Sequence, residues 1–160
     1  MLSIQLLCVG KLKEKHFSAA CAEYEKRLNP FCKLSVIELP EERLPDTPSP
    51  AQIEAALEKE AAAIFQKLPK GGKLIALCVE GGLLSSEQLA SQVRKWTVEG
   101  TSSLTLVIGG SFGLHSSVKD RAQLRLSMSP MTFPHHLARV MVLEQLYRCF
   151  QINAGTRYHK

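Results

Sequence analysis

The sequence predicts an α/β protein with a mostly parallel sheet that helices cover on both faces. Predicted strands and helices alternate from end to end of the 160-residue chain. Such alternation is typical of parallel sheets, because each helix returns the chain to the same edge of the sheet. Residues 73–79 (KLIALCV) are apolar after Lys73, as expected for a strand buried on both faces. The length fits a single domain.

Hydrophobic spacing in the first half of the chain predicts two strands and two helices. A proline-rich loop follows the second strand, and Ser49 and Gln52 then form a capping-box pattern that opens the second helix. These elements are a strand at 3–9, a helix at 15–29, a strand at 34–39 and a helix at 50–68.

The second half predicts three strands and three helices. Glu80, Gly81 and Gly82 are expected to end the strand at 73–79, and Ser85 and Gln88 repeat the capping-box pattern. The remaining elements are a helix at 85–99, a strand at 104–108, a short helix at 116–123, a strand at 124–128 and a last helix at 134–152.

Composition argues against several classes of protein. The five cysteines are scattered and include no C-x-x-C pair, so we expect no disulfide framework and no metal. Cys8, Cys78 and Cys149 lie in apolar runs and are expected to be buried. The longest uncharged apolar run is far shorter than the ~20 residues that cross a bilayer. Residues 1–10 lack the features of a signal peptide, so we expect a cytoplasmic protein with no membrane partner.

The net charge of +5 at pH 7 is concentrated in the last third of the chain. Residues 1–109 hold 13 Lys or Arg and 13 Asp or Glu, whereas residues 110–160 hold 7 and 2. Four of the five histidines lie in that second segment. This excess favours a region that faces a polyanion such as nucleic acid, although an ordinary solvated surface remains the alternative.

Two loops carry possible binding chemistry. Residues 108–114 (IGGSFGL) place three glycines after a buried strand, where ligands bind in open α/β sheets. The spacing matches neither a dinucleotide fingerprint nor a phosphate loop, and a tight strand–helix turn is the alternative. Residues 126–136 (LSMSPMTFPHH) are rich in methionine and hydroxyl groups and are suited to a flat heterocycle. The alternative is that these methionines fill gaps in the core.

The last predicted helix is apolar nearly all round, which indicates burial on two sides, by the sheet and by a second subunit. Glu144 and Arg148 are spaced for an ion pair. Arg139 lies among apolar side chains, so its guanidinium needs a carboxylate, carbonyl groups or a phosphate. The polar tail that follows ends in Arg157, Tyr158, His159 and Lys160, which are residue types that bind phosphate, stack on bases and move protons. A frayed basic end is the alternative.

Several motifs together resemble the RlmH family. The resemblance covers essentially the whole chain, in matching order and length, and rests on LLCVGKLKEKHF, EYEKRL, IGGSFGL, LSMSPMTFPHHLARV, EQLYRCFQI and the terminal YHK. It implies a SPOUT-class methyltransferase that uses S-adenosyl-L-methionine (SAM) to methylate N3 of a pseudouridine in 23S ribosomal RNA.

The resemblance also implies an architecture. It predicts a single SPOUT domain over residues 1–160, with an N-terminal α/β part at 1–100 and a trefoil knot, dimer helix and tail at 101–160. It further implies a homodimer with the active site at the subunit interface. The chain has no appended RNA-binding module, so we expect it to act on the large ribosomal subunit or the whole ribosome rather than on naked RNA.

Site residues carry over by position in the matching motifs. The expected cofactor-binding residues are Leu77, Gly109, Gly110, Met128, Ser129, Pro130, Met131, Thr132 and Phe133. The expected catalytic residues are His135, Arg139, Tyr158 and His159, and the expected RNA-binding residues are Arg139, Arg148, Arg157 and Lys160.

The chemistry sets what these residues must do. N3 of pseudouridine carries a proton and is a poor nucleophile until it is deprotonated, so we expect either a general base, His159 or His135, or charges that stabilise the ring anion. Arg139 and Arg148 are the candidates for binding phosphates or the developing negative charge. We expect the tail to be mobile until RNA binds. A non-catalytic ribosome-binding factor of the same fold, and a nucleotide- or flavin-binding protein, are the alternatives.

Overall fold

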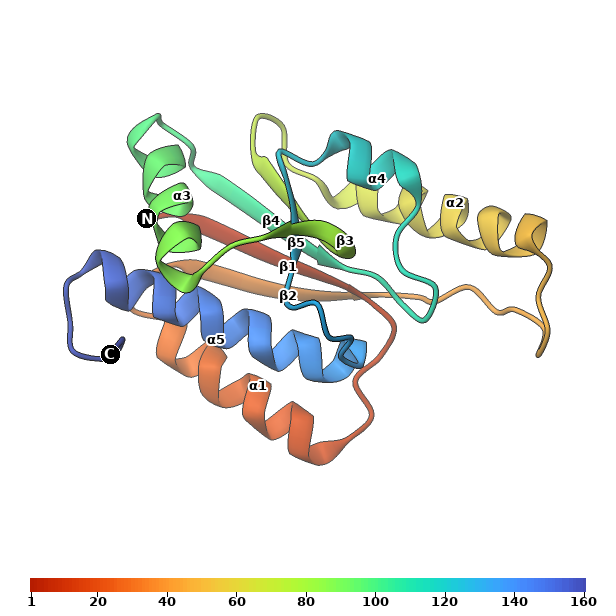
Figure 1. Cartoon of the computed structure of the whole chain (residues 1–160), viewed down its shortest axis with the longest axis horizontal. Helices are drawn as coiled ribbons and strands as arrows, with labels where there is room; N and C mark the ends of the chain where they lie inside the picture. The colour runs from red at the N-terminus through yellow and green to blue at the C-terminus, as the bar shows by residue number, and fades with distance from the viewer.

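The computed structural model describes residues 1–160 and contains one five-stranded sheet (Figure 1). The strands are β1 (Ser3–Val9), β2 (Lys33–Leu39), β3 (Lys73–Leu83), β4 (Ser103–Ile108) and β5 (Leu124–Ser127). Their order across the sheet is β2-β1-β4-β3-β5, and every neighbouring pair is parallel. The predicted α/β fold class is therefore confirmed.

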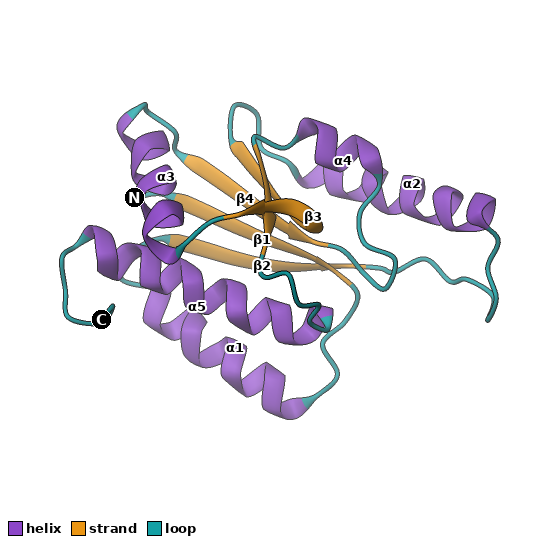
Figure 2. Cartoon of the chain, in the orientation of Figure 1, coloured by secondary structure: helices purple, strands orange, loops and turns teal.

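Helices cover both faces of this sheet (Figure 2). One face packs against α1 (Lys15–Leu28), α3 (Ser86–Val98) and α5 (His135–Asn153), and the other against α2 (Pro50–Lys67) and α4 (Ser116–Arg121). Side chains alternate along the strands, so Leu6 belongs to the first core and Leu7 to the second. The alternation explains why the strands are apolar on both faces.

Local sequence signals start two of the helices as predicted. The Ser49 hydroxyl accepts a hydrogen bond from the Gln52 N–H at 3.2 Å, and the Gln52 side-chain oxygen accepts one from the Ser49 N–H at 2.8 Å. Ser85 and Gln88 make the same reciprocal pair at 3.1 and 2.8 Å. Each box satisfies two N–H groups that a helix start otherwise leaves without a partner.

The prediction that Glu80, Gly81 and Gly82 end the third strand is wrong. β3 continues to Leu83, and its register against β5 shifts between Leu77 and Gly82. The physical reason is a close backbone approach at Gly81: a Cβ there would lie 2.8 Å from the backbone of β5. Glycine allows β3 to pass β5 at this distance.

This approach gives a testable prediction. Because its methyl group would meet backbone atoms of Arg125 and Leu126, Gly81→Ala should lower the free energy of unfolding by about 2 kcal/mol. The matched control is Gly82→Ala, whose Cβ would meet only one atom, 3.8 Å away, and should cost less than about 0.5 kcal/mol. Urea unfolding measures both, and equal losses would contradict the close approach.

The cysteine prediction is confirmed in part. Cys8 and Cys149 are buried, and burial raises the pKa of each thiol to about 12. Cys78 is only half-buried, because it lies where β3 reaches the edge of a cavity described below. None of the helices is long and apolar enough to cross a membrane.

Candidate active site

A cavity of about 730 Å³ lies at the carboxyl ends of β3, β4 and β5. The glycine loop after β4 forms one wall, and the loop between β5 and α5 forms another. Because the strands are parallel, their carboxyl ends meet at one edge of the sheet, which is where open α/β sheets bind ligands. Eight of the nine expected cofactor-binding residues line this cavity: Leu77, Gly109, Gly110, Met128, Ser129, Met131, Thr132 and Phe133.

The ninth, Pro130, does not line the cavity and is exposed. Beside it, the Ser129 hydroxyl accepts a hydrogen bond from the Met131 N–H at 2.9 Å. The Ser127 hydroxyl donates to the Ser129 carbonyl at 3.0 Å. These bonds fix the loop, with Pro130 at its outer tip.

The glycine loop is tight because its backbone folds on itself. The Gly113 N–H donates to the Gly110 carbonyl at 3.1 Å, and Gly113 has a φ of +80°. A Cβ on Gly109 would overlap the Gly113 carbonyl oxygen. Glu41, from the loop after β2, accepts hydrogen bonds from the Ser111 N–H at 3.2 Å and the Ser111 hydroxyl at 2.9 Å. The glycines of this loop therefore present backbone to the cavity, and Phe112 adds an apolar side chain.

The opposite wall leaves polar backbone atoms free. The N–H and C=O groups of Thr132 and Phe133 make no hydrogen bond within the chain. Free backbone donors and acceptors beside Met128 and Phe133 suit a flat heterocycle, whose edge they would bond and whose faces the side chains would flank.

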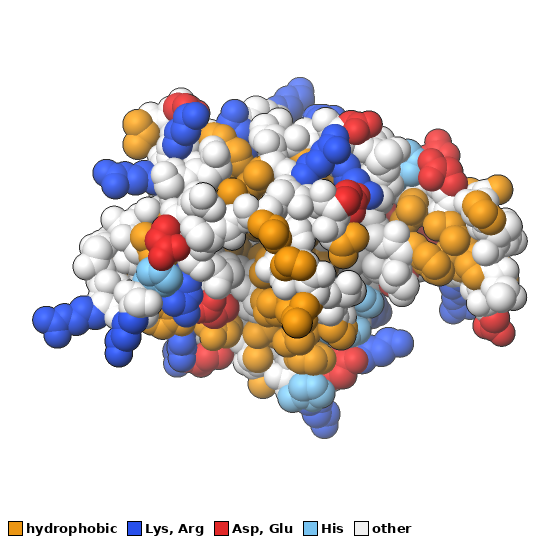
Figure 3. All heavy atoms as spheres, viewed as in Figure 1, with side chains coloured by type: hydrophobic (Ala, Val, Ile, Leu, Met, Phe, Trp, Pro, Cys, Tyr) orange, Lys and Arg blue, Asp and Glu red, His pale blue; other side chains and the backbone are white.

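The mouth of the cavity is apolar. Val79 is 71% exposed, Met131 74% and Phe112 48%, and all three line the cavity. Hydrophobic side chains gather in the middle of the face seen in Figure 3, over the crossing of β3 and β5 and over α5. A second hollow of about 400 Å³ adjoins the first and shares Leu77 and Met128 with it.

His135 is the first residue of α5 and lines the cavity. Its ring packs edge-on against His136, with centroids 4.2 Å apart, and His136 Nδ1 lies 2.9 Å from a Glu14 carboxylate oxygen. Burial, with His136 close by, lowers the pKa of His135 below its ordinary value. His135 is therefore mainly neutral at pH 7, the form in which histidine accepts a proton.

Arg139 lies one turn further along α5 and is 4% exposed. Its guanidinium donates to the Glu38 carboxylate at 2.8 Å and to the Gly10 carbonyl at 3.4 Å. Although partial burial raises the pKa of Glu38, hydrogen bonds from Arg139 and the Leu12 N–H lower it overall. The charge of Arg139 is thus balanced within the chain, and its catalytic and RNA-binding role stays a prediction.

This pair predicts an asymmetry in stability. Glu38→Leu leaves a buried guanidinium without a carboxylate and should lower the free energy of unfolding by about 3 kcal/mol. Arg139→Leu leaves a carboxylate whose side chain is 38% exposed and so reaches water, and should cost about half as much. Urea unfolding measures the loss of unfolding free energy in both variants. An equal loss in the two, or a larger loss in Arg139→Leu, would contradict the prediction.

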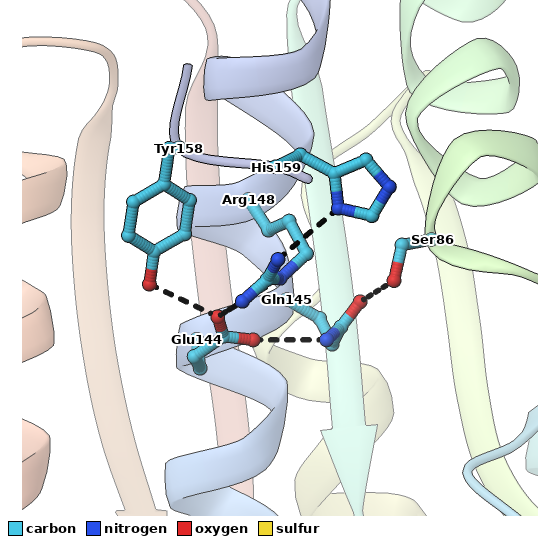
Figure 4. A network of polar contacts seen from close by, with 6 residues as sticks. All are labelled: Ser86, Glu144, Gln145, Arg148, Tyr158 and His159. Atoms are coloured by element: carbon cyan, nitrogen blue, oxygen red, sulfur yellow. Dashed lines mark hydrogen bonds and ion pairs between the residues drawn. The ribbon is translucent and has the colours of Figure 1, made fainter. Parts of the chain in front are cut away.

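The C-terminal tail is docked against α5 and α3 in the structure, and its mobility before RNA binds stays a prediction (Figure 4). The Tyr158 hydroxyl donates to Glu144 at 3.1 Å, and its ring packs beneath the Arg148 guanidinium, 4.8 Å from the centroid. Arg148 donates twice to the same Glu144 oxygen, at 3.0 and 2.6 Å, which confirms the predicted ion pair. These hydrogen bonds, which Arg148 donates to the Glu144 carboxylate, raise the pKa of Arg148.

His159 completes this cluster. Its Nδ1 lies 3.1 Å from an Arg148 nitrogen, and its Nε2 lies 2.6 Å from a Glu87 oxygen at the start of α3. The hydrogen bond from His159 lowers the pKa of Glu87. Arg157 and Lys160, also expected to bind RNA, are exposed beside the cluster.

The expected catalytic residues, together with Arg148 of the expected RNA-binding set, form two groups within one chain. His135 and Arg139 lie at the start of α5, whereas Tyr158, His159 and Arg148 lie at its other end. The helix has 19 residues and is therefore roughly 28 Å long. Sequence reasoning missed Glu38, Glu41 and Glu87, whose partners lie 101, 70 and 72 residues away along the chain.

Comparisons with known proteins agree with this geometry. A family model described as "Predicted SPOUT methyltransferase" matches residues 2–159. Two solved structures assigned to a methylase family share the fold. One, from Haemophilus influenzae Rd KW20, matches at 14% identity and a TM-score of 0.55 over 100% of this chain and 72% of that chain. The other, from Neisseria gonorrhoeae, matches at 12% identity and a TM-score of 0.56 over 99% of this chain and 87% of that chain.

A third structure, from work on the 2-OH methylation of C/U34 on tRNA, matches at 18% identity and a TM-score of 0.51 over 96% of this chain and 98% of that one. At these identities the structural likenesses establish the fold, and the family model, which spans nearly the whole sequence, establishes the family. The chain belongs to the SPOUT methyltransferase family.

Proposed function

We propose that this protein is a SAM-dependent methyltransferase of the RlmH type, which methylates N3 of a pseudouridine in 23S ribosomal RNA. The observation that carries the proposal is the cavity at the carboxyl ends of β3, β4 and β5, which is lined by His135 and eight motif residues of the resemblance. The surplus of basic residues over residues 110–160 supports an RNA substrate.

The cavity suits SAM. The glycine loop allows a ligand to approach the backbone closely, and the free backbone groups of Thr132 and Phe133 would bond the adenine edge. Met128 and Phe133 would flank the ring, and Leu77 would close the side formed by β3. When bound, SAM supplies an electrophilic methyl group on a sulfonium.

The active site is composite in this proposal. The tail cluster of Glu144, Arg148, Tyr158 and His159 packs against the second half of α5, whereas the cavity lies at its start. In this proposal a second copy brings the tail of one protomer to the cavity of the other. The exposed Val79 and Met131, at 71% and 74%, and the apolar hollow beside the cavity give a homodimer a surface to bury. The family's trefoil knot is part of the same proposal, and the close passage of β5 along Gly81 supports it.

The chain's own residues prepare the nucleophile. N3 of pseudouridine must lose its proton before it attacks, and His159 or His135 is placed to accept that proton. Arg148 would stabilise the negative charge that develops on the ring. Tyr158 and Glu144 hold Arg148 in place through the hydroxyl and carboxylate contacts of the tail cluster.

The test of this proposal has two readouts. Isothermal calorimetry should show SAM binding by the purified protein. Labelled SAM should then transfer its methyl group to ribosomes from a strain that lacks this modification, at a higher rate than to isolated large subunits or naked 23S RNA. SAM binding with no methyl transfer to any of the three would contradict the proposed RNA substrate. Absence of SAM binding would favour a non-catalytic ribosome-binding factor.

A further inference from the structure

The imidazole of His159 is held between two charged groups of the same chain. Nε2 lies 2.6 Å from Glu87 Oε1 on α3, and Nδ1 lies 3.1 Å from Arg148 Nη1 on α5. The ring is about three-quarters buried, since 25% of its side chain is exposed, whereas Glu87 is 61% exposed. Two different helices therefore fix the orientation of a ring that belongs to the chain terminus.

These two contacts determine which nitrogen carries the proton. A guanidinium has only donors, so His159 Nδ1 must accept from Arg148 and has no hydrogen. A neutral imidazole has one N–H, so Nε2 carries it and donates to the Glu87 carboxylate. The geometry fits the neutral Nε2–H form alone, because a second proton on Nδ1 would point at the Arg148 cation.

We propose that Glu87 is a positioning residue that holds His159 in its Nε2–H tautomer and directs the Nδ1 lone pair towards Arg148, where the target base is deprotonated. The inference rests on the proposed function, in which His159 takes a proton from the target base. It assigns a role to a residue outside the motifs that carry the family resemblance. Carboxylates also orient catalytic histidines in serine hydrolases, where a variant that holds the histidine in the wrong tautomer loses most of its kcat.

The surrounding charges support this geometry. Besides Glu87, the charged or titratable groups around His159 are Arg148, Glu144 and Tyr158. The Glu144 carboxylate accepts hydrogen bonds from the Nε and Nη2 atoms of Arg148 and from the Tyr158 hydroxyl. Nη1 is therefore the guanidinium nitrogen that remains to contact His159. The hydrogen bond from His159 holds the pKa of Glu87 below its ordinary value, so Glu87 stays an anion at neutral pH.

The step balances within this arrangement. An incoming uracil-type ring would replace Nδ1 as the acceptor of the Arg148 N–H, using a carbonyl oxygen beside N3. The N3 proton passes to Nδ1, the N3 electron pair forms the new N–CH3 bond, and the sulfonium sulfur keeps the electron pair of the broken S–CH3 bond. His159 becomes an imidazolium, whose charge the Glu87 carboxylate stabilises. Since all three side chains belong to one protomer, they reach a partner's cavity as a unit.

The direct test is the tautomer itself. Long-range 1H–15N correlation spectra of protein with 15N-labelled histidine resolve protonated from unprotonated ring nitrogens, and His159→Gln assigns the signals. At alkaline pH, wild-type His159 should show Nε2–H with Nδ1 unprotonated. Glu87→Ala should give a mixture of tautomers, because Nε2–H loses its carboxylate acceptor. Nδ1–H in the wild type, or an unchanged spectrum in Glu87→Ala, would overturn the proposal.

Kinetics supply the second readout. Glu87→Ala should lower kcat on the order of 10²-fold with little change in KM. Glu87→Gln, whose amide oxygen still accepts from Nε2–H, should recover most of the rate, and Glu99→Ala on the exposed end of α3 is the matched control. Equal kcat values for Glu87→Ala and Glu99→Ala would also overturn it. Because the spectra need no substrate, inactivity of the wild type on ribosomes would contradict the proposed function and leave the role of Glu87 to be judged from the tautomer.

Discussion

Deletion of residues 158–160 is expected to lower the rate of methyl transfer at least about 10²-fold while changing the Kd for SAM less than twofold. The deletion removes the His159 imidazole and the Tyr158 hydroxyl, which contact Glu87, Arg148 and Glu144. None of these residues touches the cavity proposed for SAM at the glycine loop. Single-turnover kinetics and calorimetry on the same preparation measure the two effects.

The control for this deletion is Lys70→Ala, an exposed residue in the turn before β3. It should leave both rate and affinity unchanged. The Glu144–Arg148 pair survives the deletion, so thermal unfolding should shift by only a few degrees. A truncated protein with full activity would show that the tail takes no part in the reaction.

Gly109→Ala is expected to weaken SAM binding by at least about tenfold, and the free energy of unfolding should fall by about 1–3 kcal/mol. The added methyl group would overlap the Gly113 carbonyl oxygen, so the glycine loop must open to accommodate it. The opening would also disturb the Gly113 N–H bond to the Gly110 carbonyl. Calorimetry with SAM and urea unfolding measure the two effects.

Gly82→Ala serves as the matched glycine control, because its Cβ would make only one ordinary contact and Gly82 does not line the cavity. It should bind SAM as the wild type does. If Gly109→Ala bound SAM with unchanged affinity, the loop would not form part of the cofactor site.

Most of the fold could be predicted because its signals are local. The capping boxes at Ser49 and Ser85 mark helix starts whatever the rest of the chain does. The end of β3 could not be predicted, because Gly81 and Gly82 resemble a turn. The approach of β5, from residues more than 40 positions later in the chain, decides instead that the strand continues.

The candidate site divides in the same way. Gly109 follows directly after β4, and Thr132 lies in the loop that follows β5. Parallel strands bring such residues to one edge of the sheet. Glu38, Glu41 and Glu87 were missed because nothing near them in the sequence distinguishes them from solvated carboxylates. Their contacts to Arg139, Ser111 and His159 exist only in the folded chain.

The proposed reaction of this chain is methylation of N3 of a pseudouridine in ribosomal RNA. The most direct measurement is nucleoside mass spectrometry of 23S RNA after ribosomes that lack the modification are incubated with the protein and isotope-labelled SAM. We expect the label in N3-methylpseudouridine at one position, and no label with the protein truncated after residue 157. Label in any other nucleoside, or none with a protein that binds SAM, would contradict it.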